Sequence, residues 1–289
     1  MAEKIWIGDD AGNEGDFNVA ANWSPSGVPV AGDTLIFQDN AQDLDSNADH
    51  LSGTSGNLVS VKSTYTGTVG TLVAPLTMGV VRACVDNGTI YIDDDTGDGG
   101  NVAIVRGGTA YLDGLFVDLY AVGGNVFCGE GAGTAFDATN ITADIPHASE
   151  PGVAVDNTIT IAEGIVDRLL ILNSLFTVTA TGGTIKNTYV HRGIMKASGA
   201  NLNNVYLFPE GTFRLLADAT YTTQNIYGGT YIATETGVAK LVTTMNVYES
   251  AASINLANGQ ANQTITNLNL YASPELILDR FETMTISEI

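Results

Sequence analysis

The chain of 289 residues is poor in the residues from which most catalytic and metal centres are built. Its two cysteines, Cys84 and Cys128, are too few for a disulfide scaffold or for a zinc site made of cysteines. Its three histidines, His50, His147 and His191, leave little for acid–base chemistry or metal binding. We therefore expect no enzymatic activity and no cofactor.

Positive charge and long apolar runs are also scarce. Eleven basic residues against 32 acidic ones give a net charge of -21, and the basic residues form no cluster, which argues against a nucleic-acid partner. No stretch approaches the length of a membrane-spanning segment. The N-terminus shows neither a basic nor an apolar signal region. We expect synthesis in a cytoplasm, no cleavable export signal, reduced cysteines and no membrane partner.

Helical periodicity is confined to two windows, Gly164–Ser174 and Ser273–Met284. Elsewhere, short runs of Val, Ile, Thr, Tyr and Phe alternate with Gly, Asn, Asp and Ser, which is typical of short strands joined by turns. The sequence therefore predicts an all-β protein.

The tripeptide Asn-x-Tyr occurs five times in the second half of the chain. The intervals between its tyrosines are 17, 21, 21 and 23 residues, and the middle residue is mostly of a core type. A period near 20 residues without helices predicts a β-solenoid, in which each coil stacks about 4.8 Å from the next. We expect the five units to lie in register, with the middle residues inside and the tyrosines outside as an interface row: Thr188, Val205, Ile226, Val247 and Leu270 inside; Tyr189, Tyr206, Tyr227, Tyr248 and Tyr271 outside.

Other segments fit the same architecture. Thr89–Ile92 and Thr109–Leu112 predict two earlier coils 20 residues apart. The repeat favours a further rung over a helix for Ser273–Met284. The Gly- and Ala-rich stretch Gly123–Glu150 shows no pattern and predicts an elaborated loop or a change of register.

The first 40 residues carry a different pattern, which contains both tryptophans of the chain. It reads Trp6-x-Gly8, then Asp16-Phe17-Asn18-x-Ala20-x-Asn22-Trp23-Ser24, then Gly27-Val28-Pro29-x-x-Gly32-Asp33-Thr34-Leu35-x-Phe37. This run resembles the opening segment of many bacterial and phage β-helical surface proteins, including autotransporter-like passenger domains. The resemblance covers about the first 37 residues of the chain.

The resemblance implies an N-terminal cap on a right-handed parallel β-helix, with structural rather than catalytic shared residues. Large apolar side chains suit the exposed end of a solenoid, and four are available: Trp6, Phe17, Trp23 and Phe37. We expect three regions: a cap or anchor at 1–40, irregular early coils with long loops at 41–150, and a regular solenoid at 151–289.

The one dense carboxylate cluster, Asp93–Asp98, has two interpretations. Asp93, Asp95 and Asp98 are a weak candidate for a Ca²⁺ loop, because hard cations bind several oxygen ligands from a flexible turn. A solvated turn between strands is the better interpretation. Carboxylates elsewhere do not line up as the pair that polysaccharide hydrolysis needs.

Together these features favour a structural virion protein of a tailed phage. We expect a decoration (cement) protein on the outside of the capsid, homotrimeric and bound to the major capsid protein. A tail fibre or tailspike that binds or cleaves a cell-surface polysaccharide is the first alternative. A bacterial surface adhesin is the second.

Overall fold

The computed structural model describes residues 2–95, 101–130, 135–144, 157–216, 219–233, 240–256, 263–277 and 285–288. The described chain is almost entirely β-strand, with one short 3₁₀ helix, η1 (Ala20–Asn22). Apart from the antiparallel pair of β1 (Glu3–Trp6) and β2 (Trp23–Ser24), strands of successive coils pair in parallel at intervals of about 20 residues, which confirms the expected β-solenoid. In the described part of the chain, no helix has the length and apolarity needed to cross a bilayer.

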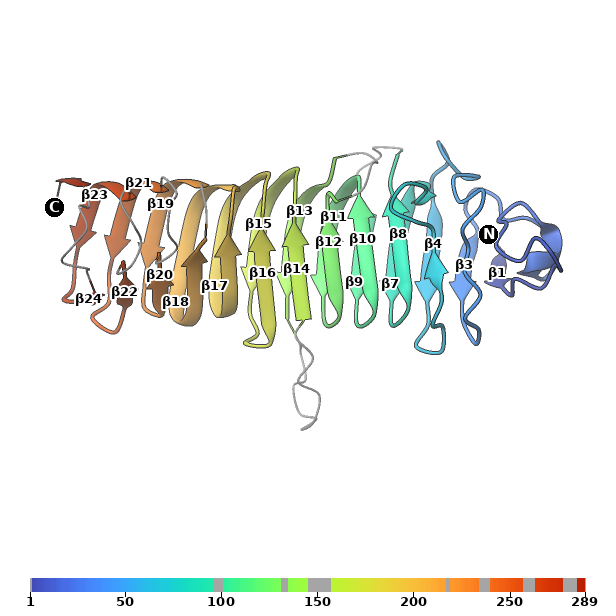
Figure 1. Ribbon diagram of the computed structural model, residues 1–289, viewed down its shortest axis with the longest axis horizontal. Helices are drawn as coiled ribbons and strands as arrows, with labels where there is room; N and C mark the ends of the chain where they lie inside the picture. The colour runs from blue at the N-terminus through green and yellow to red at the C-terminus, as the bar shows by residue number, and fades with distance from the viewer. Residues whose placement is uncertain are drawn as a thin grey trace. The chain divides into compact units, whose positions relative to one another are not determined.

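The chain divides into two compact units, residues 1–139 and 140–289. Figure 1 labels many of the strands and colours the chain by residue number. The division falls within β13 (Asp137–Ala143). The strands of the first unit are β1 (Glu3–Trp6), β2 (Trp23–Ser24), β3 (Thr34–Phe37), β4 (Asn57–Val61), β5 (Thr68–Val69), β6 (Leu76–Thr77), β7 (Val80–Val85), β8 (Thr89–Asp93), β9 (Asn101–Val105), β10 (Thr109–Asp113), β11 (Leu115–Ala121) and β12 (Asn125–Cys128).

The first unit keeps the 20-residue register that the sequence predicts. Thr109 of β10 lies beside Thr89 of β8, and the strands stay in step to their ends. Every second side chain points inward, so that Ile90, Ala110 and Val126 form one buried row across β8, β10 and β12. Burial of such rows removes apolar surface from water at every rung and is the main stabilising contribution.

The segment Gly123–Glu150 was expected to be an elaborated loop or a change of register, and the loop alternative is wrong for two parts of it. Residues Asn125–Cys128 form β12, which pairs in parallel with β10, and Asp137–Ala143 form β13. Strand β12 has only four residues between glycines, and β13 consists largely of Ala, Thr, Asn and Asp, so neither shows a long run of Val, Ile and aromatic residues.

The second unit has longer strands, and two of them turn a corner of the coil. They are β14 (Asn157–Ile161), β15 (Ile165–Ile171), β16 (Phe176–Ala180), β17 (Thr184–Ala197), β18 (Asn201–Leu215), β19 (Ala219–Ile226), β20 (Thr230–Ile232), β21 (Lys240–Val247), β22 (Ser253–Asn255), β23 (Gln263–Leu270), β24 (Glu275–Ile277) and β25 (Thr285–Glu288). One stack runs β15–β17–β18–β19–β21–β23. The other uses the second halves of β17 and β18 and continues through β20, β22 and β24.

Both windows that carried helical periodicity contain strands. Gly164–Ser174 contains β15, and the described part of Ser273–Met284 contains β24, which pairs in parallel with β22. The expectation of a further rung therefore holds for Glu275–Ile277. Residues 278–284 lie outside the described part.

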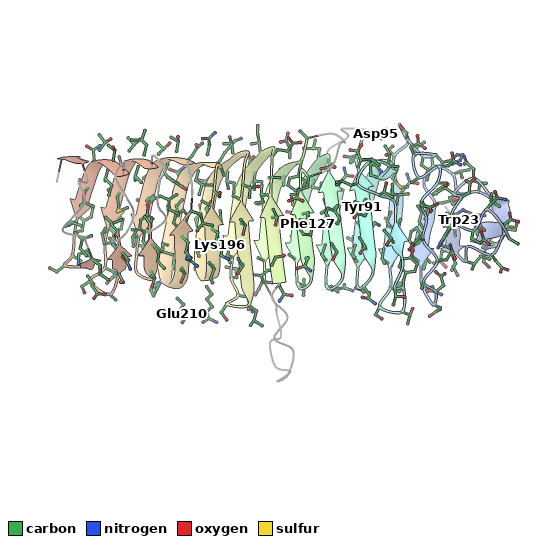
Figure 2. The ribbon with its side chains drawn as sticks, in the orientation of Figure 1. Trp23, Tyr91, Asp95, Phe127, Lys196 and Glu210 are labelled. Atoms are coloured by element: carbon green, nitrogen blue, oxygen red, sulfur yellow. The ribbon has the colours of Figure 1, made fainter. Side chains whose placement is uncertain are left out.

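Three strands, which we call the N-terminal sheet, open the first unit and continue into the solenoid through the parallel pairing of β3 with β4. Strand β1 pairs antiparallel with β2 and parallel with β3, so Trp6 lies beside both Trp23 and Phe37. These three rings and Phe17 are buried and meet mainly edge to face, with Trp6 and Trp23 5.0 Å apart at 66°. Figure 2 shows Trp23 within this N-terminal part. The expected burial of the tryptophans is confirmed.

Polar residues of the same N-terminal pattern hold the surrounding loops. Buried Asn22 donates to the carbonyl oxygens of Asn13 (2.6 Å) and Asp16 (3.0 Å) and accepts from the backbone of Asp10 (2.9 Å). The Asp33 carboxylate accepts from the backbone N–H groups of Ala2 (2.7 Å) and Val30 (3.1 Å). Burial acts to raise the pKa of Asp33, but these two hydrogen bonds and the charge of Lys4 together lower it.

Candidate interaction surface

The outer surface of the second unit carries a column of stacked aromatic rings, one from each of five strands or strand ends. Neighbouring ring centroids are 4.0, 5.5, 4.7 and 4.9 Å apart, with planes 6°, 17°, 9° and 2° from parallel. We call this set the aromatic column: His191, Phe208, Tyr227, Tyr248 and Tyr271. Parallel strands in register bring equivalent side chains to the rung spacing, which fixes the near-parallel stacking.

The five tyrosines were expected to form one row, and this is wrong. Tyr189 stacks on Tyr206 at 4.7 Å in a separate pair, with Arg168 5.9 Å above the Tyr189 ring. Tyr206 then lies beside Asn225, two residues before Tyr227. The last three Asn-x-Tyr units are therefore in register with one another but are offset by two residues from the first two.

The expectation for the middle residues is confirmed at four positions and wrong at one. Thr188, Val205, Ile226 and Val247 are buried, whereas the Leu270 side chain is 42% exposed. In the described part of the chain, the rung beyond β23 is β25, and its register reaches Glu288 beside Asn267 and goes no further along β23. Leu270 therefore lacks the described neighbour that buries Val247 one rung earlier.

The first residues of the last three units form a second column, which runs beside the aromatic column. The Asn246 amide donates to Asn225 Oδ1 at 2.9 Å, and the Asn269 amide donates to Asn246 Oδ1 at 2.8 Å. We call Asn225, Asn246 and Asn269 the asparagine column. Each of these hydrogen bonds joins one rung to the next, so some of the amide donors and acceptors of the column already have partners within the chain.

Four of the strand segments that carry these columns contain no charged residue, whereas the fifth, β17 with His191, also carries Lys186 and Arg192. Asp, Glu, Lys and Arg are absent from 201–208, 219–227, 241–248 and 263–271. These four segments are neighbours in one parallel stack, and their outward side chains are Asn, Thr, Tyr and Phe, with Leu241 and Leu270 also exposed. We call this surface the uncharged face. It is unusual in a chain of net charge -21.

The ring geometry decides what the aromatic column can bind. Each ring covers the face of the next, so the sides of the column present ring edges and hydroxyl groups. Burial, with the neighbouring Tyr227 and Tyr271, raises the pKa of Tyr248, and burial lowers the pKa of His191. Both shifts favour the uncharged forms of His191 and Tyr248, and the column presents ring edges and hydrogen-bonding tips.

A second aromatic stack, which was not expected from the sequence, lies in the first unit. Tyr111 of β10 stacks on Tyr91 of β8 at 4.3 Å and on Phe127 of β12 at 4.6 Å, with planes within 10°. Figure 2 labels the two outer residues of this stack, Tyr91 and Phe127. The 20-residue interval that predicted the two coils also places Tyr91 beside Tyr111, so this signal was present. Phe127 was not expected in this stack, because its strand β12 was not predicted from the sequence.

The structure describes two of the three calcium candidates, Asp93 and Asp95. Asp93 is buried at the end of β8, whereas the Asp95 carboxylate accepts hydrogen bonds from Ser52 and Gly53. Asp98 lies outside the described residues. The four aromatic residues of the cap, Trp6, Phe17, Trp23 and Phe37, are all buried, so their contribution is structural rather than direct contact with a partner.

Within the described residues, no group of three or more His, Cys, Asp or Glu side chains is arranged to hold a metal ion. The uncharged face spans four neighbouring segments of one parallel stack and is an organised surface of the second unit. Comparison of the chain with protein-family models, with curated proteins and with solved structures finds no match.

Proposed function

We propose that the protein is a structural virion protein of a tailed phage, a decoration protein that binds the outside of the capsid as a homotrimer. The observation that carries this proposal is the uncharged face. Chains of net charge -21 repel one another, and contact through a face without carboxylates keeps the like charges of two copies apart. Tyrosine edges and Asn and Thr side chains offer apolar area and hydrogen bonds to such an interface.

The architecture supports a role in assembly. Residue-by-residue stacking gives a rigid surface whose side chains repeat at the rung spacing, which suits a partner with an equally regular surface. The major capsid protein in a phage head is such a partner, and the trimer is matched to three-fold positions of the head. The protein would be made in the host cytoplasm and located on the capsid exterior.

The alternative of a polysaccharide-binding tail fibre is supported less well. Sugars stack on the open faces of aromatic rings, and the aromatic column covers the faces of its inner rings. The short pair Tyr189–Tyr206 is restricted in the same way. A bacterial adhesin is favoured by no observation in the described residues.

The test has two measurements on the full chain. Light scattering after size-exclusion chromatography gives the mass in solution, where we expect a trimer. Sedimentation with purified undecorated phage heads gives binding, where we expect the protein to pellet with the heads. A monomer that ignores heads but depolymerises bacterial polysaccharide would overturn the proposal in favour of the tailspike.

Charge variants locate the interface. Thr222 and Thr243 are exposed on adjacent strands of the uncharged face, so the double variant Thr222→Asp/Thr243→Asp adds two carboxylates there. We expect it to be monomeric. The matched control, Ser250→Asp/Ala251→Asp, adds the same charge in an exposed turn and should remain trimeric.

A further inference from the structure

A hollow of about 460 Å³ lies on the outer side of the N-terminal sheet. It is lined by residues from β1, β2 and the loops that follow β1 and β3: Ile5, Ile7, Asp9, Ser24, Gln38, Asp39 and Asn40. The opposite face of the same sheet carries the buried Trp6, Trp23 and Phe37. The strands that line the hollow are therefore held from behind by the buried aromatic cluster of the cap.

The lining combines apolar residues with unused polar groups. Ile7 is 38% exposed, and Ile5 is half-buried. The side chains of Asp9, Asp39 and Gln38 make no hydrogen bond or ion pair with any described residue. The remaining amide, Asn40, is held in place because it donates to the Trp6 carbonyl oxygen at 2.8 Å.

No positive charge of the described chain enters the hollow. Lys4, the cation on the same strand, is buried and donates to the Pro25 carbonyl oxygen at 3.1 Å. Both ionisable groups of the lining are carboxylates. A ligand that suits the hollow must therefore bring a positive charge and also cover the isoleucines.

We propose that this hollow takes an arginine or lysine side chain presented by the protein partner, with its methylene stem on Ile5 and Ile7 and its cationic head at Asp9 and Asp39. Long basic side chains combine these two chemistries, because the stem is apolar and the head is charged. The assignment rests on the proposed function, in which the partner is the capsid surface. It separates two contacts: the uncharged face joins copies of the chain, and the N-terminal hollow anchors them to the head.

The chemistry of the hollow is tested without a capsid. The probe is the peptide acetyl-Ala-Ala-Arg-Ala-Ala-amide, titrated into the full-length protein and followed by backbone amide shifts in NMR spectra. We expect saturable shifts at Ile7 and Asp39, about tenfold weaker binding for Asp9→Asn/Asp39→Asn, and no saturation with the citrulline peptide, which has the same shape without the charge. Equal binding of the citrulline peptide, or shifts confined to other residues, would overturn the assignment.

The role of the hollow is tested with heads. We expect Asp9→Asn/Asp39→Asn to bind undecorated heads about tenfold more weakly and with less salt dependence, while remaining trimeric. The control Glu3→Gln/Asp49→Asn removes two exposed carboxylates outside the hollow and should bind normally. If the wild-type protein binds heads and the hollow variant binds equally well, the hollow does not anchor the protein to the head. If the wild-type protein does not bind heads, the proposed function fails, and the peptide titration alone decides the chemistry of the hollow.

Discussion

The molecule uses aromatic rings in two ways, and the backbone around them decides which. In the N-terminal cap, Trp6, Trp23 and Phe17 come from a short strand, a second strand and a loop, and their rings meet at 65° and 66°. In the aromatic column of the second unit, the rings come from equivalent places on successive coils and lie within 17° of parallel. Irregular backbone allows the edge-to-face geometry, whereas an in-register stack imposes the parallel one.

The two arrangements differ in what they leave exposed. The cap buries its rings completely and ties their polar atoms to backbone, as Trp23 Nε1 donates to the Phe17 carbonyl oxygen at 2.9 Å. The column leaves ring edges and hydroxyl groups at the surface, and Tyr271 is 65% exposed. The cap should therefore dominate stability, and the column should dominate interaction.

Truncation of a buried ring in the cap should lower the stability of the protein more than any substitution in the aromatic column. Trp23→Ala removes a buried ring from the cap, so we expect the free energy of unfolding to fall by about 3–5 kcal/mol. Both tryptophans lie in the first unit, so urea unfolding of this variant can be followed by the fluorescence of the remaining Trp6. A loss below about 1 kcal/mol would contradict the structural role of the cap.

The same contrast explains what sequence reasoning could predict. The cap was predictable because large aromatic side chains gathered within 40 residues favour a common core. The 20-residue interval between Thr89 and Thr109 predicted their register directly. The two-residue offset between Tyr206 and Tyr227 was not predictable, because a shift of two preserves the alternation of inward and outward side chains.

The interaction surfaces were harder to predict than the core. The asparagine column and the aromatic column depend on that offset, so a single row of tyrosines was the natural but incorrect expectation. The N-terminal hollow is assembled from residues near 5–9, 24 and 38–40, and no local pattern connects them. The sequence shows that four separate segments lack charged residues. That these segments lie side by side follows only from the order in which the strands stack.

Acid should weaken the cap through Asp33. Its folded-state pKa lies below the ordinary value of 3.8, so the carboxylate contributes stability above that pH, and this contribution is lost as the pH falls through the folded-state pKa. Asp33→Asn should cost about 1–3 kcal/mol at neutral pH, because an amide cannot accept both backbone hydrogen bonds equally. The difference between Asp33→Asn and wild type should shrink in acid, whereas the exposed control Asp49→Asn should match wild type throughout.

Inside the second unit, one substitution should increase stability. Thr188 is 0% exposed, and its hydroxyl has no hydrogen-bond partner among the described residues. Its neighbours on adjacent rungs are Leu169 and Val205. Thr188→Val keeps the shape and removes the buried hydroxyl, so we expect a gain of about 1 kcal/mol in urea unfolding followed by circular dichroism. Thr212→Val, at a half-exposed outward position, should give no comparable gain. A loss of stability in Thr188→Val would mean that the hydroxyl is satisfied in solution.

The end of the aromatic column should show the smallest effect on stability. Tyr271 has one ring neighbour in the column, Tyr248 at 4.9 Å, and most of its surface is exposed, so Tyr271→Ala should cost less than about 1 kcal/mol. A double-mutant cycle with Tyr248→Ala isolates the stacking energy of the pair, which we expect to be about 0.5–1 kcal/mol. A cost for Tyr271→Ala as large as that of Trp23→Ala would show that the column serves as core and would remove the contrast between the two aromatic arrangements. A small cost combined with weaker trimer formation would assign the column to the interface, because a side chain that contributes little to folding can affect assembly only through its contacts with another chain.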